Sequence, residues 1–198
     1  MERKTVKLQG IDIDTFDFGQ ALEYAGSISG QVVTINPEMI MYAGKNPEFA
    51  RILREAQLVI PDGIGVEIAL KILGHKVRRI AGIELARAML DHAPSVALIG
   101  AKPQVIEKAV ENLTTLNITY WHDGYFANDE KIYSDLKEKQ PRLLLVALGS
   151  PRQEEFIYKA KELLPNTLMI GVGGSFDVWA GKVKRAPKIF QKSGLEWL

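Results

Sequence analysis

Short apolar runs recur along the chain and alternate with segments in which apolar residues have helical spacing. The runs predict strands at 32–35, 58–60, 96–99, 118–121, 143–148 and 168–172. An alternating segment at 5–13 predicts a further strand. The segments between them predict helices at about 15–25, 47–56, 66–73, 103–113, 128–139 and 151–164, and helices that begin near 37 and 82.

The alternation of strand and helix, with short Gly-rich connections, predicts an α/β fold. We expect a mostly parallel sheet with helices on both faces, a Rossmann-like arrangement, and a single compact domain over residues 1–198. In such an open sheet, ligands bind at the edge formed by the carboxyl ends of the strands. The turns that follow the strands are therefore the places to search for functional residues.

Composition limits the classes of protein to which the chain can belong. Apolar residues make up 46% and charged residues 25%, as in a soluble globular protein. The net charge of +1 gives no overall attraction to nucleic acid, so we expect no nucleic-acid partner. The lack of cysteine excludes disulfides, a thiolate nucleophile and a Cys-based zinc site. The N-terminus resembles no signal peptide, and no run approaches about 18 apolar residues, so we expect a cytoplasmic protein, soluble or peripheral to a membrane.

An acidic residue lies on a tight turn between the apolar run at 58–60 and the next predicted helix. Pro61 removes a backbone donor, and Gly63 and Gly65 permit turn geometry that side chains would block. Asp62 therefore lies at the predicted ligand-binding edge, where its carboxylate can act as a base. Its alternative role is to cap the helix that follows, a common use of Asp.

Two further segments carry side chains that suit a sugar or a phosphate. Thr34 and Asn36 end the strand at 32–35 and can bond sugar hydroxyls or phosphate, although Asn36 can instead cap the next helix. Arg78 and Arg79 precede another helix, and arginine binds phosphate through paired hydrogen bonds. Adjacent arginines on a loop are also often only solvated charges.

The turn at 149–154 follows the most apolar predicted strand and opens a helix. Arg152 and Gln153 lie where this helix starts, and the backbone amides at a helix N-terminus favour an anion. The sequence contains neither a P-loop nor a G-x-S-x-G elbow. This turn is therefore a candidate phosphate site at a helix start that is not a P-loop.

The turn at 171–177 is the last Gly-rich turn. Gly173 and Gly174 allow a ligand to approach the backbone, and Asp177 can bond a ribose or a base. Phe176 stands where the dinucleotide fingerprint has its third glycine, and the segment lies late in the chain, so the fingerprint is not matched. Together, the polar turns at the strand ends favour a nucleotide-type ligand.

Metal-binding patterns are weak in this sequence. His75, His92 and His122 lack the spacing of metal ligands. Asp12 and Asp14 form the D-x-D triplet of many metal-dependent glycosyltransferases, but they lie at a strand end before a predicted helix start. We therefore expect no bound metal and no cofactor.

The segment at 182–192 is basic and contains no acidic residue. Its cations are interleaved with apolar residues, a pattern that suits an anionic membrane surface or a lipid diphosphate. The alternative is a solvated basic helix. The cations are Lys182, Lys184, Arg185, Lys188 and Lys192.

In their order along the chain, these motifs resemble those of the WecG/TagA/CpsF glycosyltransferases. The matching segments are 34–38, 61–66, 149–154, 172–177, 180–187 and 194–197, and the resemblance spans nearly all of the 198 residues. It implies an inverting, metal-independent transfer of N-acetylmannosamine from UDP-N-acetylmannosamine (UDP-ManNAc) to undecaprenyl-diphosphate-linked N-acetylglucosamine. The product would be a β-1,4-linked disaccharide lipid of wall teichoic acid synthesis.

The resemblance also implies roles for individual residues. Asp62 matches the family's base, which takes the proton of the acceptor hydroxyl as that hydroxyl attacks the anomeric carbon. Thr34 and Asn36 match a substrate-contacting strand end, which we assign to the donor. Without a metal, the departing UDP needs positive charge or aligned N–H groups. The expected sources are Arg79, the helix start at Arg152 and the backbone of Gly173 and Gly174, with Gln153 at the sugar and Asp177 at the uridine.

Members of this family continue beyond the segment that matches 194–197, with a basic and apolar tail, whereas this sequence stops at Leu198. We therefore expect a glycosyltransferase core that lacks the membrane-associating tail and has weak activity. Its site of action would be the inner face of the cell membrane, where it binds peripherally. Apolar surface left by a missing tail predicts a homo-oligomer in solution.

Two other functions fit parts of the sequence. A nicotinamide-dependent dehydrogenase is the alternative enzyme, and the misplaced glycine pattern argues against it. A non-catalytic protein that binds nucleotide sugars is the other alternative. It predicts that Asp62→Asn leaves turnover of the UDP-sugar at its background level.

Overall fold

The structure, a computed structural model, describes residues 2–183. The strands are β1 (Thr5–Leu8), β2 (Ile11–Asp14), β3 (Gly30–Ile35), β4 (Leu58–Pro61), β5 (Val96–Gly100), β6 (Ile118–His122), β7 (Leu143–Ala147) and β8 (Leu168–Gly171). The helices are α1 (Phe18–Ser27), α2 (Pro37–Ala43), α3 (Pro47–Arg54), α4 (Ile64–Ile72), α5 (Gly82–Leu90), α6 (Pro103–Asn112), α7 (Asp129–Lys139), α8 (Arg152–Leu163) and α9 (Ser175–Trp179).

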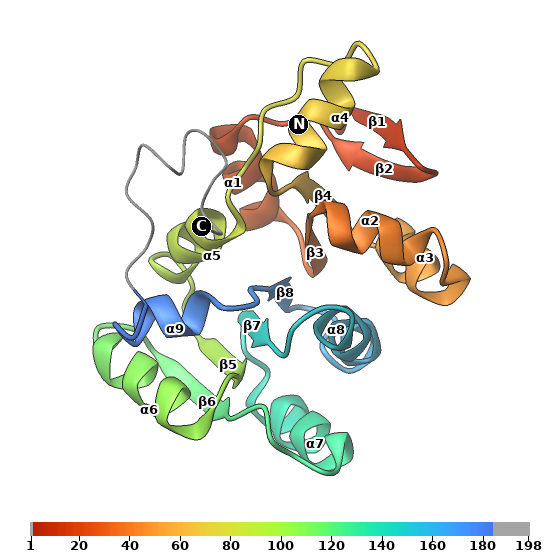
Figure 1. The fold of residues 1–198 in the computed structure, drawn as a ribbon. Coiled ribbons are helices and arrows are strands. Elements are labelled where there is room, and N and C mark those ends of the chain that lie inside the picture. Colours follow the sequence, from red (N-terminus) through yellow and green to blue (C-terminus); the bar gives the residue numbers. More distant parts are fainter. Residues whose placement is uncertain (1, 184–198) are drawn as a thin grey trace.

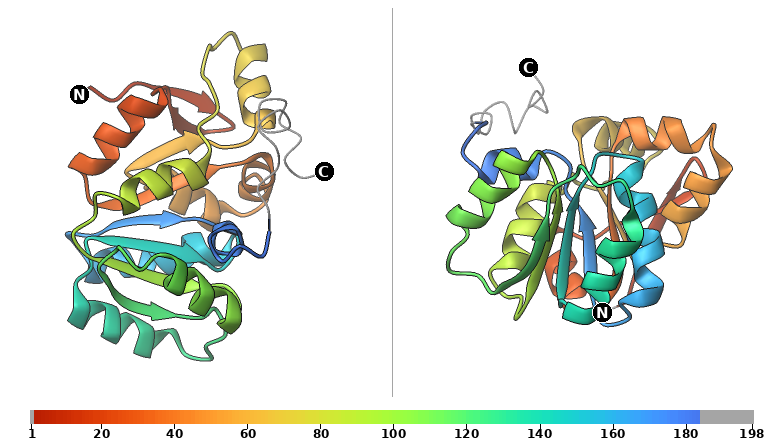
Figure 2. Two further views of the ribbon diagram at one scale, coloured as in Figure 1. Left: turned by 90° about the vertical axis from the view of Figure 1, so that its left-hand side faces the viewer. Right: turned by 90° about the horizontal axis from the view of Figure 1, so that it is seen from below.

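A parallel sheet of six strands, in the order β4-β3-β8-β7-β5-β6, forms the centre of the molecule. Helices cover both of its faces, as Figures 1 and 2 show. The predicted α/β class with Rossmann-like layering is confirmed. The strands and helices predicted after residue 30 are all present with small shifts at their ends, whereas α9 is absent from the predictions.

Alternate residues of the central strands face opposite helical layers, which explains the continuous apolar runs. In β7, Leu143 and Leu145 pack into a cluster with α1, α5, α6 and α9. Leu144 and Val146 pack on the other face, against α7 and α8. Over β3 and β4, that second face is covered by α2, α3 and α4.

The N-terminal hairpin of β1 and β2 packs beside the edge strand β4. Asp14 is fully buried, forms an ion pair with Arg3, and accepts a hydrogen bond from the Val59 N–H of β4 over 2.8 Å. Asp14 of the D-x-D triplet therefore has a structural role. Within residues 2–183, no group of three or more His, Asp or Glu side chains is arranged to hold a metal ion.

The predicted start of α1 at Thr15 is wrong. Thr15 bonds back to the Lys4 carbonyl oxygen, and Asp17 caps the helix instead. The Asp17 side chain accepts from the Gln20 N–H while the Gln20 side chain accepts from the Asp17 N–H. This reciprocal pair is a capping box, which satisfies two backbone donors that a single threonine would not.

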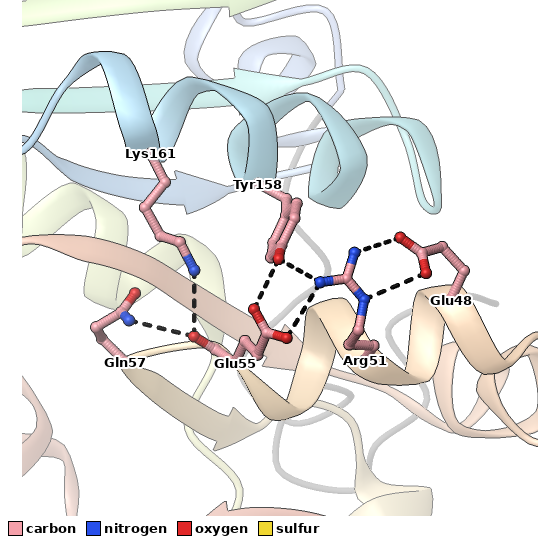
Figure 3. Close-up of polar contacts among 6 residues, drawn as sticks. All are labelled: Glu48, Arg51, Glu55, Gln57, Tyr158 and Lys161. Atoms are coloured by element: carbon pink, nitrogen blue, oxygen red, sulfur yellow. Dashed lines mark hydrogen bonds and ion pairs between the residues drawn. The ribbon is translucent and has the colours of Figure 1, made fainter.

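A surface cluster centred on Arg51 joins α3 to α8 (Figure 3). The Arg51 guanidinium lies 2.5 Å from a Glu48 carboxylate oxygen and donates to the Tyr158 hydroxyl over 2.6 Å. Tyr158 donates in turn to Glu55 over 2.7 Å, and this bond is the main cause of the lowered pKa of the Glu55 carboxyl. Since α3 and α8 lead into the amino ends of β4 and β8, the cluster lies away from the ligand-binding edge.

In the part of the chain that the structure describes, no helix has the length and apolar character needed to cross a bilayer. The predicted membrane-facing basic segment begins at Lys182, but most of it, 184–192, lies outside the described residues.

Candidate functional site

The carboxyl ends of β4, β3, β8, β7 and β5 lie in this order along one edge of the sheet. Asp62 directly follows β4, and Thr34 lies near the end of β3. Gly173 follows β8, and Arg152 begins the helix after β7. The predicted residues therefore share this edge, but they are distributed along it rather than gathered in one cluster.

Asp62 is held by three elements. Its N–H donates to the Ile35 carbonyl oxygen of β3 over 2.8 Å. Its Oδ2 accepts a hydrogen bond from the Gly82 N–H, 3.0 Å away, at the start of α5. The Arg79 Nε lies 3.8 Å from Oδ1, and the Asp62 side chain remains 33% exposed. The carboxylate is thus oriented by the protein and still accessible to a substrate.

Asp62 is not itself the N-cap residue of the helix that follows. Gly63, with φ of 88°, holds that position before α4 and has no side chain with which to cap it. The carboxylate instead bonds the first residue of α5, which lies 20 residues later in the chain. A local reading cannot find this contact, because it depends on the path of the chain between α4 and α5.

Gly82 brings Thr34 and Asp62 into one corner. A Cβ at Gly82 would lie 2.7 Å from Thr34 Cγ2 and 3.1 Å from Asp62 Oδ2, so α5 can start this close only with glycine. The Thr34 hydroxyl lies 3.5 Å from the Gly171 carbonyl oxygen at the end of β8. We call the group of Thr34, Asp62, Arg79 and Gly82 the acid corner.

Asn36 and Arg79 contribute to the framework of this corner. Asn36 Oδ1 accepts a hydrogen bond from the Met39 N–H over 2.9 Å, which confirms its capping role at α2. The Arg79 backbone N–H donates to Glu67 Oε2 over 2.8 Å. The Arg79 side chain is 13% exposed and lies beside Asp62. Arg79 is therefore placed at the predicted base.

Gln153 lies beneath the turn that follows β8 and is buried. Its Oε1 accepts a hydrogen bond from the Gly173 N–H over 3.1 Å, and its Nε2 donates to Glu154 Oε1 over 2.7 Å. The Gly173 amide, a predicted phosphate donor, is thus engaged within the protein. The next residue, Gly174, lies at the start of α9.

A hollow of about 470 Å³ opens at the carboxyl ends of β5 and β7. The helices that follow these two strands diverge, because α6 covers one face of the sheet and α8 the other. Such a divergence is where open α/β sheets bind ligands. We call this cavity the cationic hollow; its charged lining residues are Lys102, Arg152, Asp177 and Lys182.

The backbone at the end of β5 forms the floor of the hollow. Gly100 has φ of 122° and Ala101 has φ of 62°, both positive. A Cβ on Gly100 would lie 2.3 Å from the Ala147 carbonyl oxygen of β7. The Ala101 N–H donates to that oxygen over 2.9 Å, and the Ala101 carbonyl accepts from the Gly124 N–H over 2.8 Å. These contacts join the ends of β5 and β7 to the loop after β6.

Arg152 and Asp177 line the hollow from different helices. Arg152 donates to the Gly124 carbonyl oxygen over 3.0 Å, and its guanidinium lies over the Phe126 ring, 4.7 Å from the centroid. Asp177 belongs to α9, and its carbonyl oxygen accepts from the Lys182 N–H over 3.0 Å. This bond folds the segment that follows α9 back on the helix, so that Lys182 lines the same hollow as Asp177.

Three residues with polar side chains line the hollow but were not predicted from the sequence as site residues, namely Lys102, Tyr125 and Lys182. Lys102 stands in a Gly-Ala-Lys-Pro turn between a strand and a helix, which was an available signal. Lys182 is recognised from sequence only as part of the basic C-terminal segment. Tyr125, also in the lining, carries no comparable signal.

Asp62 of the acid corner and the cationic hollow lie on opposite sides of β3 and β8. From β4 to β7 there are three strand spacings, or about 14 Å. A nucleoside diphosphate sugar is an extended molecule, with the nucleoside at one end and the reactive sugar carbon at the other. The arrangement suits an anion held in the hollow and a sugar presented to a carboxylate at the corner.

The chain is similar to known proteins over nearly its whole length. The model of the glycosyl transferase WecG/TagA/CpsF family matches residues 6–198. A relative from Bacillus spizizenii, named N-acetylglucosaminyldiphosphoundecaprenol N-acetyl-beta-D-mannosaminyltransferase, is 36% identical over 211 residues. The match covers 100% of this chain and 82% of the relative. Both the acid corner and the cationic hollow lie within the matched ranges.

Proposed function

The chain belongs to the WecG/TagA/CpsF glycosyltransferase family, and from this membership we propose that it transfers N-acetylmannosamine from UDP-ManNAc to N-acetylglucosaminyl-diphosphoundecaprenol. The name of the Bacillus spizizenii relative describes this sugar and this lipid acceptor. The structural observation that carries the proposal is an accessible carboxylate, Asp62, on the same sheet edge as a separate hollow with three cations. The product is the β-1,4-linked disaccharide lipid of wall teichoic acid synthesis.

Asp62 is the general base of the proposed reaction. The acceptor hydroxyl attacks the anomeric carbon of the donor, Asp62 takes the hydroxyl proton, and the bond to UDP breaks as the new glycosidic bond forms. A single displacement of this kind inverts the configuration at the anomeric carbon. The Gly82 N–H and the nearby Arg79 guanidinium orient the carboxylate for this proton transfer.

The UDP part of the donor is assigned to the cationic hollow. Lys102, Arg152 and Lys182 supply positive charge for the diphosphate, so the proposed reaction needs no metal ion. Asp177 can accept hydrogen bonds from the ribose or the base. Arg79 lies beside Asp62, and we therefore assign it to the base rather than to the departing UDP.

The donor sugar is assigned to the strand ends between the hollow and the corner. Thr34 lies near the end of β3 and Asn36 directly follows it, while Gly173 and Gly174 follow its neighbour β8. Gln153 supports this region from below through its bond to the Gly173 N–H. A sugar held here has its anomeric carbon near Asp62.

We propose that the protein acts peripherally at the cytoplasmic face of the membrane and forms a homo-oligomer. The acceptor named for the relative carries an undecaprenyl chain, which partitions into lipid. Ile68 and Ile72 of α4 and the C-cap residue Leu73 are exposed, at 50%, 80% and 54%. Exposed apolar side chains of this kind support association with another surface.

The test is the release of UDP from UDP-ManNAc in the presence of a lipid-linked N-acetylglucosamine acceptor. We expect Asp62→Asn to lower kcat by about 10²- to 10⁴-fold, because the base is lost. UDP binding, measured by calorimetry, should be retained. Asp91→Asn is the matched control, because Asp91 pairs with Arg87 just beyond the end of α5 and should leave turnover unchanged.

Unchanged turnover in Asp62→Asn would contradict the base assignment and favour the non-catalytic binding protein. The dehydrogenase alternative is set aside by the family membership. A calorimetric comparison of UDP with NAD provides an independent check, and we expect only UDP to bind.

A further inference from the structure

A buried polar cluster lies behind the turn that follows β8, and the proposed reaction does not use it directly. It consists of Gln31 of β3 and Gln153 and Glu154 of α8, which are 0%, 6% and 3% exposed. Gln31 Nε2 donates to the Glu154 carbonyl oxygen over 3.3 Å. Gln153 links Glu154 Oε1 to the Gly173 N–H. A chain of hydrogen bonds thus runs from β3 through α8 to the Gly173 turn at the sheet edge.

Two acceptor atoms of this cluster have no hydrogen-bond partner among the described residues. They are Gln31 Oε1 and Glu154 Oε2. Buried polar atoms are nearly always paired, because an unpaired one forfeits its bonds to water. With Glu154 ionised, neither atom can satisfy the other, because a carboxylate oxygen and an amide oxygen both only accept hydrogen bonds. A single proton on Glu154 Oε2 converts it into a donor, and Gln31, whose Nε2 already contacts the Glu154 carbonyl oxygen, has an unpaired acceptor in Oε1.

We propose that Glu154 is a neutral carboxylic acid that donates its proton to Gln31 Oε1 and thereby positions Gln153 and the Gly173 turn. The Gln153 amide needs one defined orientation, with its oxygen on the Gly173 N–H and its nitrogen on Glu154 Oε1. The neutral acid fixes this orientation because its carbonyl oxygen accepts while its hydroxyl donates. The catalytic consequence rests on the proposed function, whereas the protonation of Glu154 does not.

The surroundings of Glu154 favour the neutral form. Burial raises the pKa of the Glu154 carboxyl, and the charge of Glu155 on the same helix acts in the same direction. The hydrogen bond that Gln153 donates to Oε1, and the nearby Ser150 side chain, act in the opposite direction on this pKa but are outweighed. An ionised Glu154 would also be a buried charge, which is costly without a paired cation.

This protonation makes folding stability depend on pH in a defined direction. The folded pKa lies above the ordinary value of 4.5, so between the two values the folded state binds more protons than the unfolded state. The free energy of unfolding therefore contains a contribution that falls as pH rises from 4.5 through the folded pKa. Replacing Glu154 by a neutral side chain removes this contribution.

The experiment compares Glu154→Gln with Glu154→Met. The Gln variant supplies a donor to Gln31 and an acceptor to Gln153, so we expect kcat and the melting temperature at neutral pH to be retained. We expect the Met variant, which supplies neither, to lower kcat by roughly tenfold or more through a displaced turn. Chemical unfolding across pH should show the predicted decline in wild type relative to Glu154→Gln.

Infrared difference spectroscopy gives a direct readout that does not depend on activity. Wild type at neutral pH should show the carbonyl band of a protonated carboxylic acid, and Glu154→Gln should lack it. Absence of the band in wild type, or a Gln variant as impaired as the Met variant, would overturn the proposal. If wild type shows the band but no turnover with UDP-ManNAc, the proposed function fails and the protonated Glu154 stands.

Discussion

The acid corner and the cationic hollow share one edge of the sheet but are built in different ways. At the corner, one carboxylate is held by backbone bonds to β3 and α5, and a glycine lets these elements meet closely. Around the hollow, charged side chains from separate elements surround a backbone with positive φ. The corner therefore fixes the direction of one group, as proton transfer requires. The hollow spreads positive charge over an opening, as binding of a diphosphate requires.

This difference predicts that the two regions control different kinetic parameters. Removal of the Asp62 carboxylate, the proposed base, should lower kcat, because in the proposed reaction the proton moves only as the bond forms. Loss of a cation in the hollow should mainly weaken donor binding and raise KM. Substitutions outside both regions, and outside the buried cluster of Gln31, Gln153 and Glu154 behind the Gly173 turn, should affect stability alone.

The largest stability effect is expected from the backbone that forms the hollow. We expect Gly100→Ala to lower the free energy of unfolding by about 3 kcal/mol or more, because its Cβ would overlap the Ala147 carbonyl oxygen at a positive φ. Gly74→Ala is the matched control, with φ of 87° and no atom within 4 Å of the added Cβ. It should cost only about 1 kcal/mol. Urea unfolding measures both, and equal losses would show that the close contact with β7 is unimportant.

An intermediate effect is expected from the charge of the hollow. Lys102→Ala should raise KM for UDP-ManNAc about tenfold with little change in kcat, because a charge-assisted contact to the diphosphate is lost. Lys108→Ala is the control, since Lys108 lies exposed on the same helix and pairs with Glu111. A fall in kcat as large as the rise in KM would break the proposed division between the two regions.

The smallest effect is expected from the surface cluster in Figure 3. Arg51→Ala removes the bonds to Glu48 and Glu55 at α3 itself, and the bond to Tyr158 that joins α3 to α8. Because exposed ion pairs contribute little, we expect the melting temperature to fall by about 2 °C or less. Thermal unfolding and steady-state kinetics test this together, and a changed KM or kcat would show that the cluster influences the site.

Parts of the fold and site could be predicted because their signals are local. The continuous apolar run that became β7 reports burial on both faces, and the turn at Asp62 follows directly from a strand end with proline and glycine. Asn36 carries its capping role in its position before a proline. The start of α1 was missed because the capping box of Asp17 and Gln20 competes with Thr15 for the same role.

The cationic hollow and the buried cluster could not be predicted in this way. Lys102 and Lys182 come together only because β5, β7 and α9 converge. Gln31 and Glu154 are separated by 123 residues. They meet because α8 leads from β7 into β8, and β8 pairs with β3. The spacing of residues along the chain does not predict such long-range contacts.

Local patterns along the chain specify the layered α/β architecture and the polar turns at the strand ends, because neighbouring residues set burial and turn geometry. The strand order is set in the folded molecule, and with it the contact of Asp62 with Gly82 and the distance between the acid corner and the cationic hollow. The physical reason is that pairing between parallel strands is set by packing of the whole sheet. A strand's own pattern specifies which faces are buried, but not which strand lies beside it.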